Sequence, residues 1–116
     1  MATAKNKAKL QPYWYTLESE REDDNATKWF IKPLTPAQKE QLTTSDEFGH
    51  LGFHMKSYDK ALAFALKDWN NLNNEDGDPV KYSIANMELI DDVDRTYLAL
   101  EIYTSASLKA EEIKNS

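Results

Sequence analysis

The sequence predicts an α+β fold, in which an N-terminal antiparallel β-hairpin packs against three to four α-helices. Two short runs rich in aromatic and β-branched residues flank a charged turn, which is the pattern of a hairpin. Two longer segments carry apolar residues at three- and four-residue intervals, which is the pattern of helices that bury one face. A hairpin alone is marginally stable, so we expect these helices to cover it.

Composition limits the number of domains and the kinds of partner. The 116 residues suit one domain over residues 11–116, preceded by a disordered polar tail over residues 1–10. The net charge of −6 repels phosphate backbones, so no nucleic-acid partner is expected. The absence of cysteine fits a reducing cytoplasm, and no apolar run approaches the roughly 20 residues of a membrane-spanning helix. We therefore expect a soluble, cytoplasmic protein without membrane contact.

The predicted hairpin joins strands at Pro12–Leu17 and Thr27–Lys32 through the polar stretch Glu18–Ala26. Its strands are rich in large aromatic side chains, among them Trp14, Tyr15, Trp29 and Phe30. Such residues can stack on bases or sugars, or they can fill both faces of a sheet that helices cover. Because no basic cluster accompanies them, we expect core packing.

The clearest local signal in the chain is the start of a helix. Thr35 can accept an amide hydrogen bond as the N-cap, Pro36 suits the first helical position, and Gln38 can complete a capping box. A loop over Asp46–Gly52 and a short third strand at Phe53–Lys56 are expected to follow this helix.

Two long helices are expected in the rest of the chain. The first should span Ser57–Leu72, and its apolar stripe consists of Tyr58, Leu62, Ala65, Leu66, Trp69 and Leu72. The second should span Asp91–Ser105, with acidic residues at the positive end of its dipole. Between them, Asn70–Pro79 is rich in turn-forming residues and Ser83 can cap a weak helical turn. Ser107 can cap a final short helix.

Both long helices carry more apolar residues than one buried face requires. Five apolar residues share one face of the second helix: Leu89, Val93, Tyr97, Leu100 and Tyr103. Leu98 and Ile102 lie nearly opposite that face, and Phe64 lies off the stripe of the first helix. Apolar residues on a second face indicate central burial, an oligomer contact or a groove for a partner. We assign Phe64, Leu98 and Ile102 to a protein-interaction surface and expect a homo-oligomer.

No spacing of residues assembles a catalytic centre. The chain has no nucleophile elbow and no glycine-rich phosphate loop. His50 and His54 have the four-residue spacing of a metal-binding pair, but Gly49 and Gly52 disfavour a helix there. A small metal-dependent hydrolase, using both histidines and nearby carboxylates, is the alternative from another class. We expect no catalytic residue, no cofactor and no bound metal.

Several segments resemble small tail-assembly proteins of long-tailed bacteriophages. One is Phe30–Thr35, which leads into a short helix. Another joins Ala65–Leu72, expected as a helix ending in tryptophan, to the acidic turn and extended segment of Asp76–Ser83. The ending Ser107–Ser116 also looks like that of such proteins. The resemblance runs from Trp29 to the C-terminus, but its motifs are short and none is a chemical signature.

The resemblance implies a tail-assembly chaperone of a phage or prophage. Proteins of this class are non-enzymatic, bind the aggregation-prone tape-measure protein and help tail-tube subunits polymerise around it in the bacterial host cell. The nearest rival is a structural protein of the virion, such as a head–tail connector or a tail-completion protein. Another rival is a host-directed inhibitor whose acidity mimics nucleic acid. No functional residue is carried over, because the family has no catalytic motif.

Overall fold

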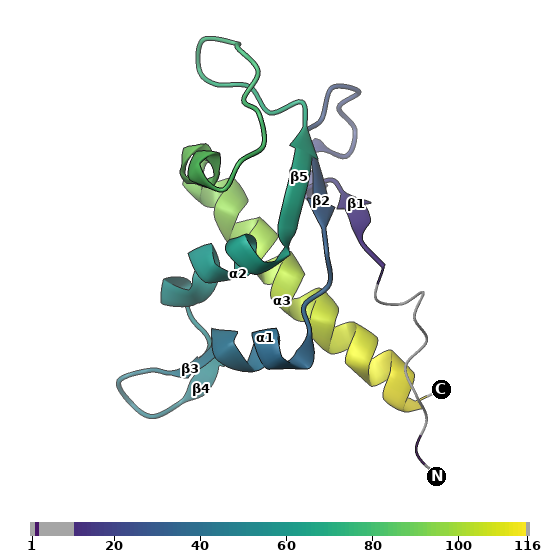
Figure 1. The fold of residues 1–116 in the computed structure, drawn as a ribbon, viewed down its shortest axis with the longest axis vertical. Helices are drawn as coiled ribbons and strands as arrows, with labels where there is room; N and C mark the ends of the chain where they lie inside the picture. Colours follow the sequence, from purple (N-terminus) through teal and green to yellow (C-terminus); the bar gives the residue numbers. More distant parts are fainter. Residues whose placement is uncertain (1, 3–10, 116) are drawn as a thin grey trace.

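The computed structural model describes residue 2 and residues 11–115, with residues 106–115 described by their backbone alone. The expected tail over residues 1–10 therefore lies, apart from residue 2, outside the described residues. The described part contains three α-helices and two antiparallel sheets, which confirms the expected α+β class (Figure 1).

The first sheet contains the predicted hairpin. β1 (Tyr13–Tyr15) pairs with β2 (Lys28–Ile31), and β2 pairs on its other side with β5 (Leu66–Asn70). All three strands run antiparallel to their neighbours, in the order β1-β2-β5. Successive side chains of a strand point to opposite faces, so the sheet has one inner and one outer face.

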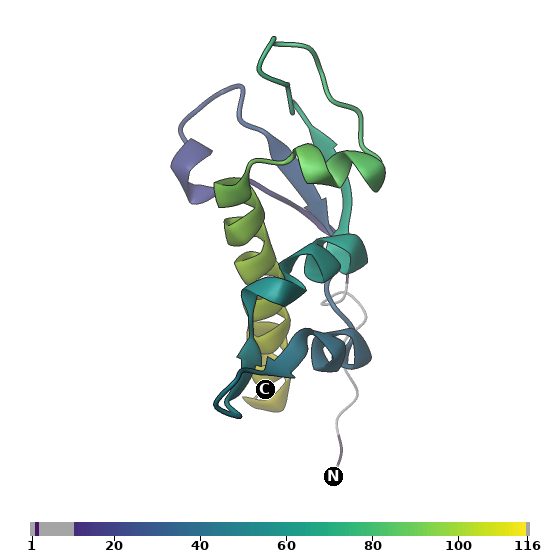
Figure 2. The ribbon, with the colours of Figure 1, turned by 90° about the vertical axis from the view of Figure 1, so that its left-hand side faces the viewer.

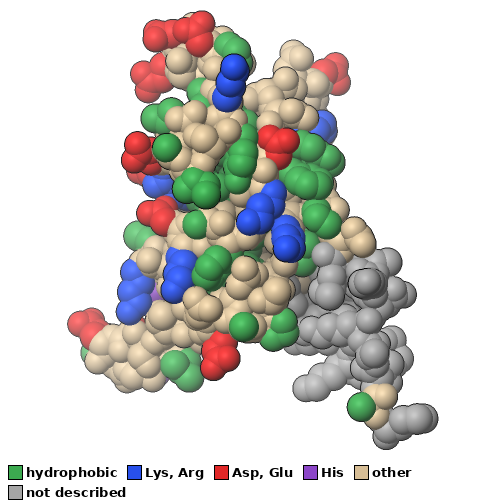
Figure 3. Space-filling view, viewed as in Figure 1, with side chains coloured by type: hydrophobic (Ala, Val, Ile, Leu, Met, Phe, Trp, Pro, Cys, Tyr) green, Lys and Arg blue, Asp and Glu red, His purple; other side chains and the backbone are tan. Residues whose placement is uncertain are grey.

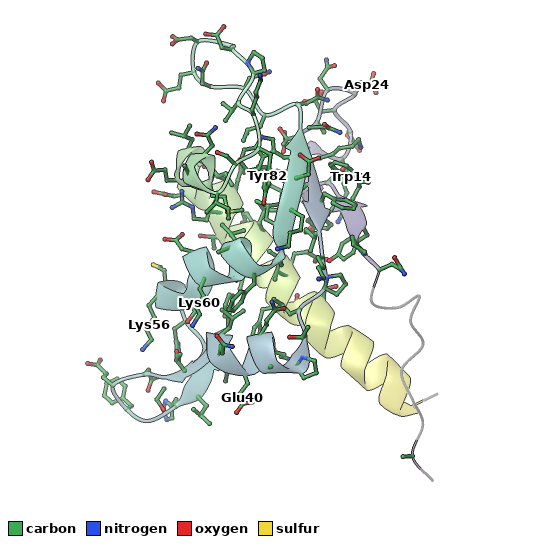
Figure 4. The ribbon with its side chains drawn as sticks, viewed as in Figure 1. Trp14, Asp24, Glu40, Lys56, Lys60 and Tyr82 are labelled. Atoms are coloured by element: carbon green, nitrogen blue, oxygen red, sulfur yellow. The ribbon has the colours of Figure 1, made fainter. Side chains whose placement is uncertain are left out.

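The two faces of this sheet differ in burial. On the inner face Trp29 is completely buried, and its ring centroid lies 6.1 Å from that of Trp69 in an edge-to-face arrangement. On the outer face Trp14 remains exposed beside Phe30, with ring centroids 4.8 Å apart (Figure 4). The expected core packing of the hairpin aromatics is therefore confirmed for Trp29, whereas Trp14 lies at the surface.

The second half of the helix expected over Ser57–Leu72 is a strand. α2 spans Tyr58–Ala65, and β5 begins at the next residue. A register shift in the pairing of β2 with β5 places one extra residue in β5, so Leu66 and Trp69 are both buried although they lie three residues apart. Buried residues three positions apart are also typical of a helix, and for this reason the apolar periodicity predicted a helix where the chain forms a strand.

α1 (Pro36–Leu42) begins where the sequence predicts it. The Gln38 backbone N–H donates to the Thr35 hydroxyl at 3.2 Å, and the Thr35 N–H donates to Gln38 Oε1 at 3.0 Å. These two bonds complete the capping box and satisfy two amides that the helix itself leaves without acceptors.

A second, smaller sheet separates α1 from α2. It consists of β3 (Thr43–Ser45) and β4 (Leu51–Phe53), which form an antiparallel hairpin at one end of the molecule (Figure 1). Asp46 shapes the connecting loop, because its Oδ1 accepts two backbone N–H groups, each at 2.9 Å. The third strand expected at Phe53–Lys56 thus lies earlier in the chain and belongs to its own hairpin.

The last helix, α3 (Asp92–Asn115), is continuous. The separate final helix expected after Ser107 does not form, because α3 continues through that residue. Before α3, η4 (Ala85–Leu89) is a short 3-10 helix whose N-cap residue is Ile84, not the expected Ser83; the Ser83 hydroxyl, one residue earlier, accepts the Asn86 N–H at 3.0 Å. Figures 1 and 2 show α3 running along the molecule beside α2, with which it packs.

Two hydrogen bonds attach the chain after the acidic loop to β5. Trp69 Nε1 donates to the Val80 carbonyl at 2.7 Å, and the Tyr82 hydroxyl donates to the Leu66 carbonyl at 2.9 Å (Figure 4). These bonds hold the segment against β5. Along the residues that the structure describes, no helix has the length and apolarity that crossing a membrane requires.

Candidate protein-docking surface

Two of the three residues assigned to an interaction surface are buried. Leu98 is 0% exposed and Ile102 is 2% exposed, because their face of α3 packs into the core beside α2. Phe64 is partly buried against the same core, and the Lys60 Nζ lies 5.7 Å from its ring centroid. The prediction that Leu98 and Ile102 form a surface for another chain is therefore wrong, because both side chains are buried in the core of the domain.

The exposed apolar face of α3 is the opposite one. Val93 is 60% exposed, Tyr97 is 58% exposed and Leu100 is 37% exposed. Their four- and three-residue spacing aligns them as a stripe along the helix. The sequence places these residues on one face, but it does not determine which of the two apolar faces the neighbouring elements cover. α3 therefore does carry apolar residues beyond those that the core buries, and they lie on the face opposite Leu98 and Ile102.

A groove of about 500 Å³ lies beside this stripe, between α3 and the chain that follows β1. Its apolar lining consists of Tyr15, Leu17, Tyr97 and Leu100, and its polar lining consists of Glu18, Ser19, Glu101 and Thr104. η2 (Glu18–Glu20), a short 3-10 helix, forms part of its rim. A concave surface that combines apolar and polar side chains suits an amphipathic segment of another polypeptide.

Tyr13 connects the two walls of the groove. Its hydroxyl forms hydrogen bonds of 3.2 Å to Glu101 Oε1 and 3.2 Å to Ser105 Oγ, both on α3. Burial is the main reason that the pKa of Tyr13 is raised to about 12; the Ser105 bond lowers it and the Glu101 charge raises it. The phenol is therefore neutral at physiological pH, and its hydrogen bonds link β1 to α3.

A second hollow, of about 480 Å³, lies at the N-terminal end of α3. Its lining consists of apolar Leu72, Val80 and Leu89, the amides Asn73 and Asn74, and acidic Glu75, Asp76, Asp91 and Asp94. Burial, followed by the charge of Asp91, raises the pKa of Asp94. Figure 3 shows acidic side chains gathered over the loop that follows β5, at the top of the molecule. This end of α3 therefore combines apolar surface with concentrated negative charge.

The two histidines lie beside the β3–β4 hairpin, outside any α-helix. His50 Nδ1 lies 3.5 Å from Asp46 Oδ2, and His54 Nε2 lies 3.4 Å from the His50 carbonyl oxygen. The backbone bond from His50 is the main cause that lowers the pKa of Asp46. Over the described ranges, no three His, Cys, Asp or Glu side chains form a group that could hold a metal ion. Asp46 instead serves the loop.

Other exposed apolar side chains lie apart from the α3 stripe: Trp14, Phe48, Leu51, Met55 and Ile84. Singly exposed apolar residues are common on folded proteins and need no partner. The α3 face differs because several such residues share one helix face and adjoin a groove.

Comparison with known proteins names no relative, since no family model, curated protein or solved structure matches the chain.

Proposed function

We propose that this protein is a non-enzymatic binding factor in the assembly of long phage tails, a cytoplasmic chaperone of the tape-measure protein that helps tail-tube subunits polymerise. The observation that carries the binding role is the exposed stripe of Val93, Tyr97 and Leu100 beside the groove. Apolar side chains concentrated on one helix face can cover an apolar segment of a partner and keep it from aggregating.

The structure of α3 suits such a role. Leu98 and Ile102 anchor one face of the helix in the core, so the opposite face is presented on a rigid support. The homo-oligomer expected from the sequence depended on Leu98 and Ile102 being free. Because both are buried, we assign the contact to the other face of α3 and to a different protein.

The tail-assembly role itself rests on the sequence resemblance. Phe30–Thr35 keeps the arrangement that the resemblance implies, since the end of β2 leads into the capped helix α1. Trp69, by contrast, lies inside β5 and not at the end of a helix, so that part of the pattern gives no support.

Co-expression with the tape-measure protein of the same phage genome tests the proposal. The wild-type chain is expected to keep that protein in the soluble fraction, and Tyr97→Asp is expected to lose this effect while it still folds. Leu51→Asp is the control, because Leu51 is also an exposed apolar residue, at 75% against 58% for Tyr97, but lies on β4. A tape-measure protein that stays equally soluble without the chain contradicts the role. Stoichiometric presence of the chain in purified virions would favour the structural-protein rival instead.

A further inference from the structure

The surface along α3 is longer than the groove alone. Val93 lies four residues after Leu89, which lines the N-terminal hollow, and four residues before Tyr97, which lines the groove. From Val93 to Thr104 the helix rises about 16 Å, or about three turns. We name this surface, from Leu89 to Thr104 with its two hollows, the α3 track.

The charged residues that line the two hollows of the α3 track have one sign. Within the described part of the chain, the charged residues that line its hollows are all acidic: Glu18, Glu75, Asp76, Asp91, Asp94 and Glu101. Arg21, which follows η2, lines neither hollow: its guanidinium lies over the Tyr15 ring, 5.8 Å from the centroid, and its Nε donates to the Thr16 carbonyl at 3.4 Å, so one positive charge lies beside the groove. The track therefore combines an apolar floor with a negative rim.

We propose that the α3 track binds an amphipathic α-helix of another protein, in which Lys or Arg residues flank the apolar face. This inference rests on the proposed function, because both use the same face, and it adds the chemistry of the partner segment. A second copy of this chain would bring carboxylates against carboxylates, which opposes association. A basic helix instead places cations beside them, including the closely spaced Asp91 and Asp94.

The α3 floor of the track favours a helix over an extended peptide. Extended peptides gain much of their affinity from main-chain hydrogen bonds to an open sheet edge. The floor of the track is a helix, whose backbone groups are already paired along its own axis. What it offers is a ridge of side chains at three- and four-residue spacing, and a second helix packs against such a ridge by fitting its own side chains between them.

Three synthetic peptides of about 14 residues, long enough for almost four helical turns, test the inference on the full-length protein. The first carries Leu at helical spacing flanked by Lys, the second replaces every Lys with Glu, and the third inserts a central Pro that breaks the helix. Fluorescence anisotropy measures binding and circular dichroism measures helicity. The Lys peptide should bind, gain helicity and weaken as salt rises. The other two should bind at least about tenfold more weakly, since several ion pairs of up to about fivefold each are lost or misplaced.

Variants of the protein locate the binding site. Glu18→Gln and Asp94→Asn should each weaken binding of the Lys peptide by up to about fivefold, the range for an ion pair at the protein surface; Glu18 is exposed and Asp94 is partly buried. Glu40→Gln is the matched control, because Glu40 is exposed on α1 and lines neither hollow (Figure 4). It should leave binding unchanged.

Two results overturn the inference: equal affinity for the Lys and Glu peptides, or a dimer of the wild-type chain that Tyr97→Asp dissociates. The two proposals fail separately. If the Lys peptide binds the track but the solubility of the tape-measure protein does not depend on the chain, the proposed function fails and the inference stands. If the peptides show no charge preference but tape-measure solubility depends on Tyr97, the inference fails and the function stands.

Discussion

Replacing Leu98 and Tyr97 one at a time shows which face of α3 stabilises the fold. Leu98 is completely buried, and truncating a buried Leu to Ala costs about 2–5 kcal/mol, because apolar contacts are lost and a cavity is left. Each kcal/mol lowers the melting temperature of a domain of this size by about 4 °C, so Leu98→Ala should lower it by about 8–20 °C. Tyr97 is largely exposed, and Tyr97→Ala should change the free energy of unfolding by only about 0.5 kcal/mol or less.

Urea unfolding followed by tryptophan fluorescence measures both variants. Trp29 and Trp69 are buried in the folded state, so their emission should shift strongly when the core opens. Far-ultraviolet circular dichroism of the folded variants controls for a change in helix content. The assignment of faces is refuted if Leu98→Ala unfolds at the wild-type urea concentration, or if Tyr97→Ala is destabilised as much as Leu98→Ala.

Three further predictions concern other elements of the fold. Thr35→Ala removes the N-cap of α1 and should lower the free energy of unfolding by about 1 kcal/mol, measured by urea titration. The pKa of Tyr13 is about 12 in the fold against an ordinary value of 10.0, so its contribution to stability is complete below pH 10 and is lost as pH rises toward 12. The wild type should therefore lose stability more steeply over that range than Tyr13→Phe, and parallel pH profiles would contradict this. The pKa of Asp46 is lowered from 3.8, mainly by the backbone N–H of His50, so its carboxylate orders the loop above pH 3.8 and this order is lost as pH falls through the lowered pKa. The His50 amide resonance should follow that titration, and Asp46→Ala should abolish it.

Local signals in the sequence were sufficient where the structure depends on neighbours along the chain. The capping box of Thr35 and Gln38 needs only residues three apart, and it forms as expected. Ser83 also bonds to the Asn86 N–H three residues later, although the N-cap of η4 is Ile84. The hairpin of β1 and β2 also follows from two adjacent strands and the turn between them.

The sequence was insufficient where distant elements decide the outcome. Leu66 and Trp69 are three residues apart, which resembles the apolar stripe of a helix. They lie in a strand instead, and both are buried because the pairing of that strand with β2 contains a register shift. The prediction of the interaction residues Leu98 and Ile102 was wrong for a related reason. α3 is apolar on two faces, and only its packing beside α2 decides that Leu98 is buried while Val93 and Tyr97 are exposed. The apolar periodicity therefore predicted both apolar faces of α3, but it did not predict which of them is buried.

The carboxylates of the α3 track illustrate the same limit. Glu18 follows β1 and Asp94 lies in α3, so no local pattern relates them. Folding brings the chain after β1 against α3, and Tyr13 connects the two elements by its bonds to Glu101 and Ser105. The acidic rim is therefore a property of the tertiary structure, although the net charge of −6 indicates an acidic protein from the start.

Amide chemical-shift mapping with the Lys peptide tests most directly whether the α3 track is a docking surface. In a titration of the isotope-labelled protein, the amides of residues 93–104 on α3 and of residues 15–19 should shift together, with one shared dissociation constant. The amides of the β3–β4 hairpin should remain unchanged and serve as the internal control. Shifts confined to that hairpin or to the outer face of the sheet around Trp14, or no shifts at saturating peptide, would contradict the account.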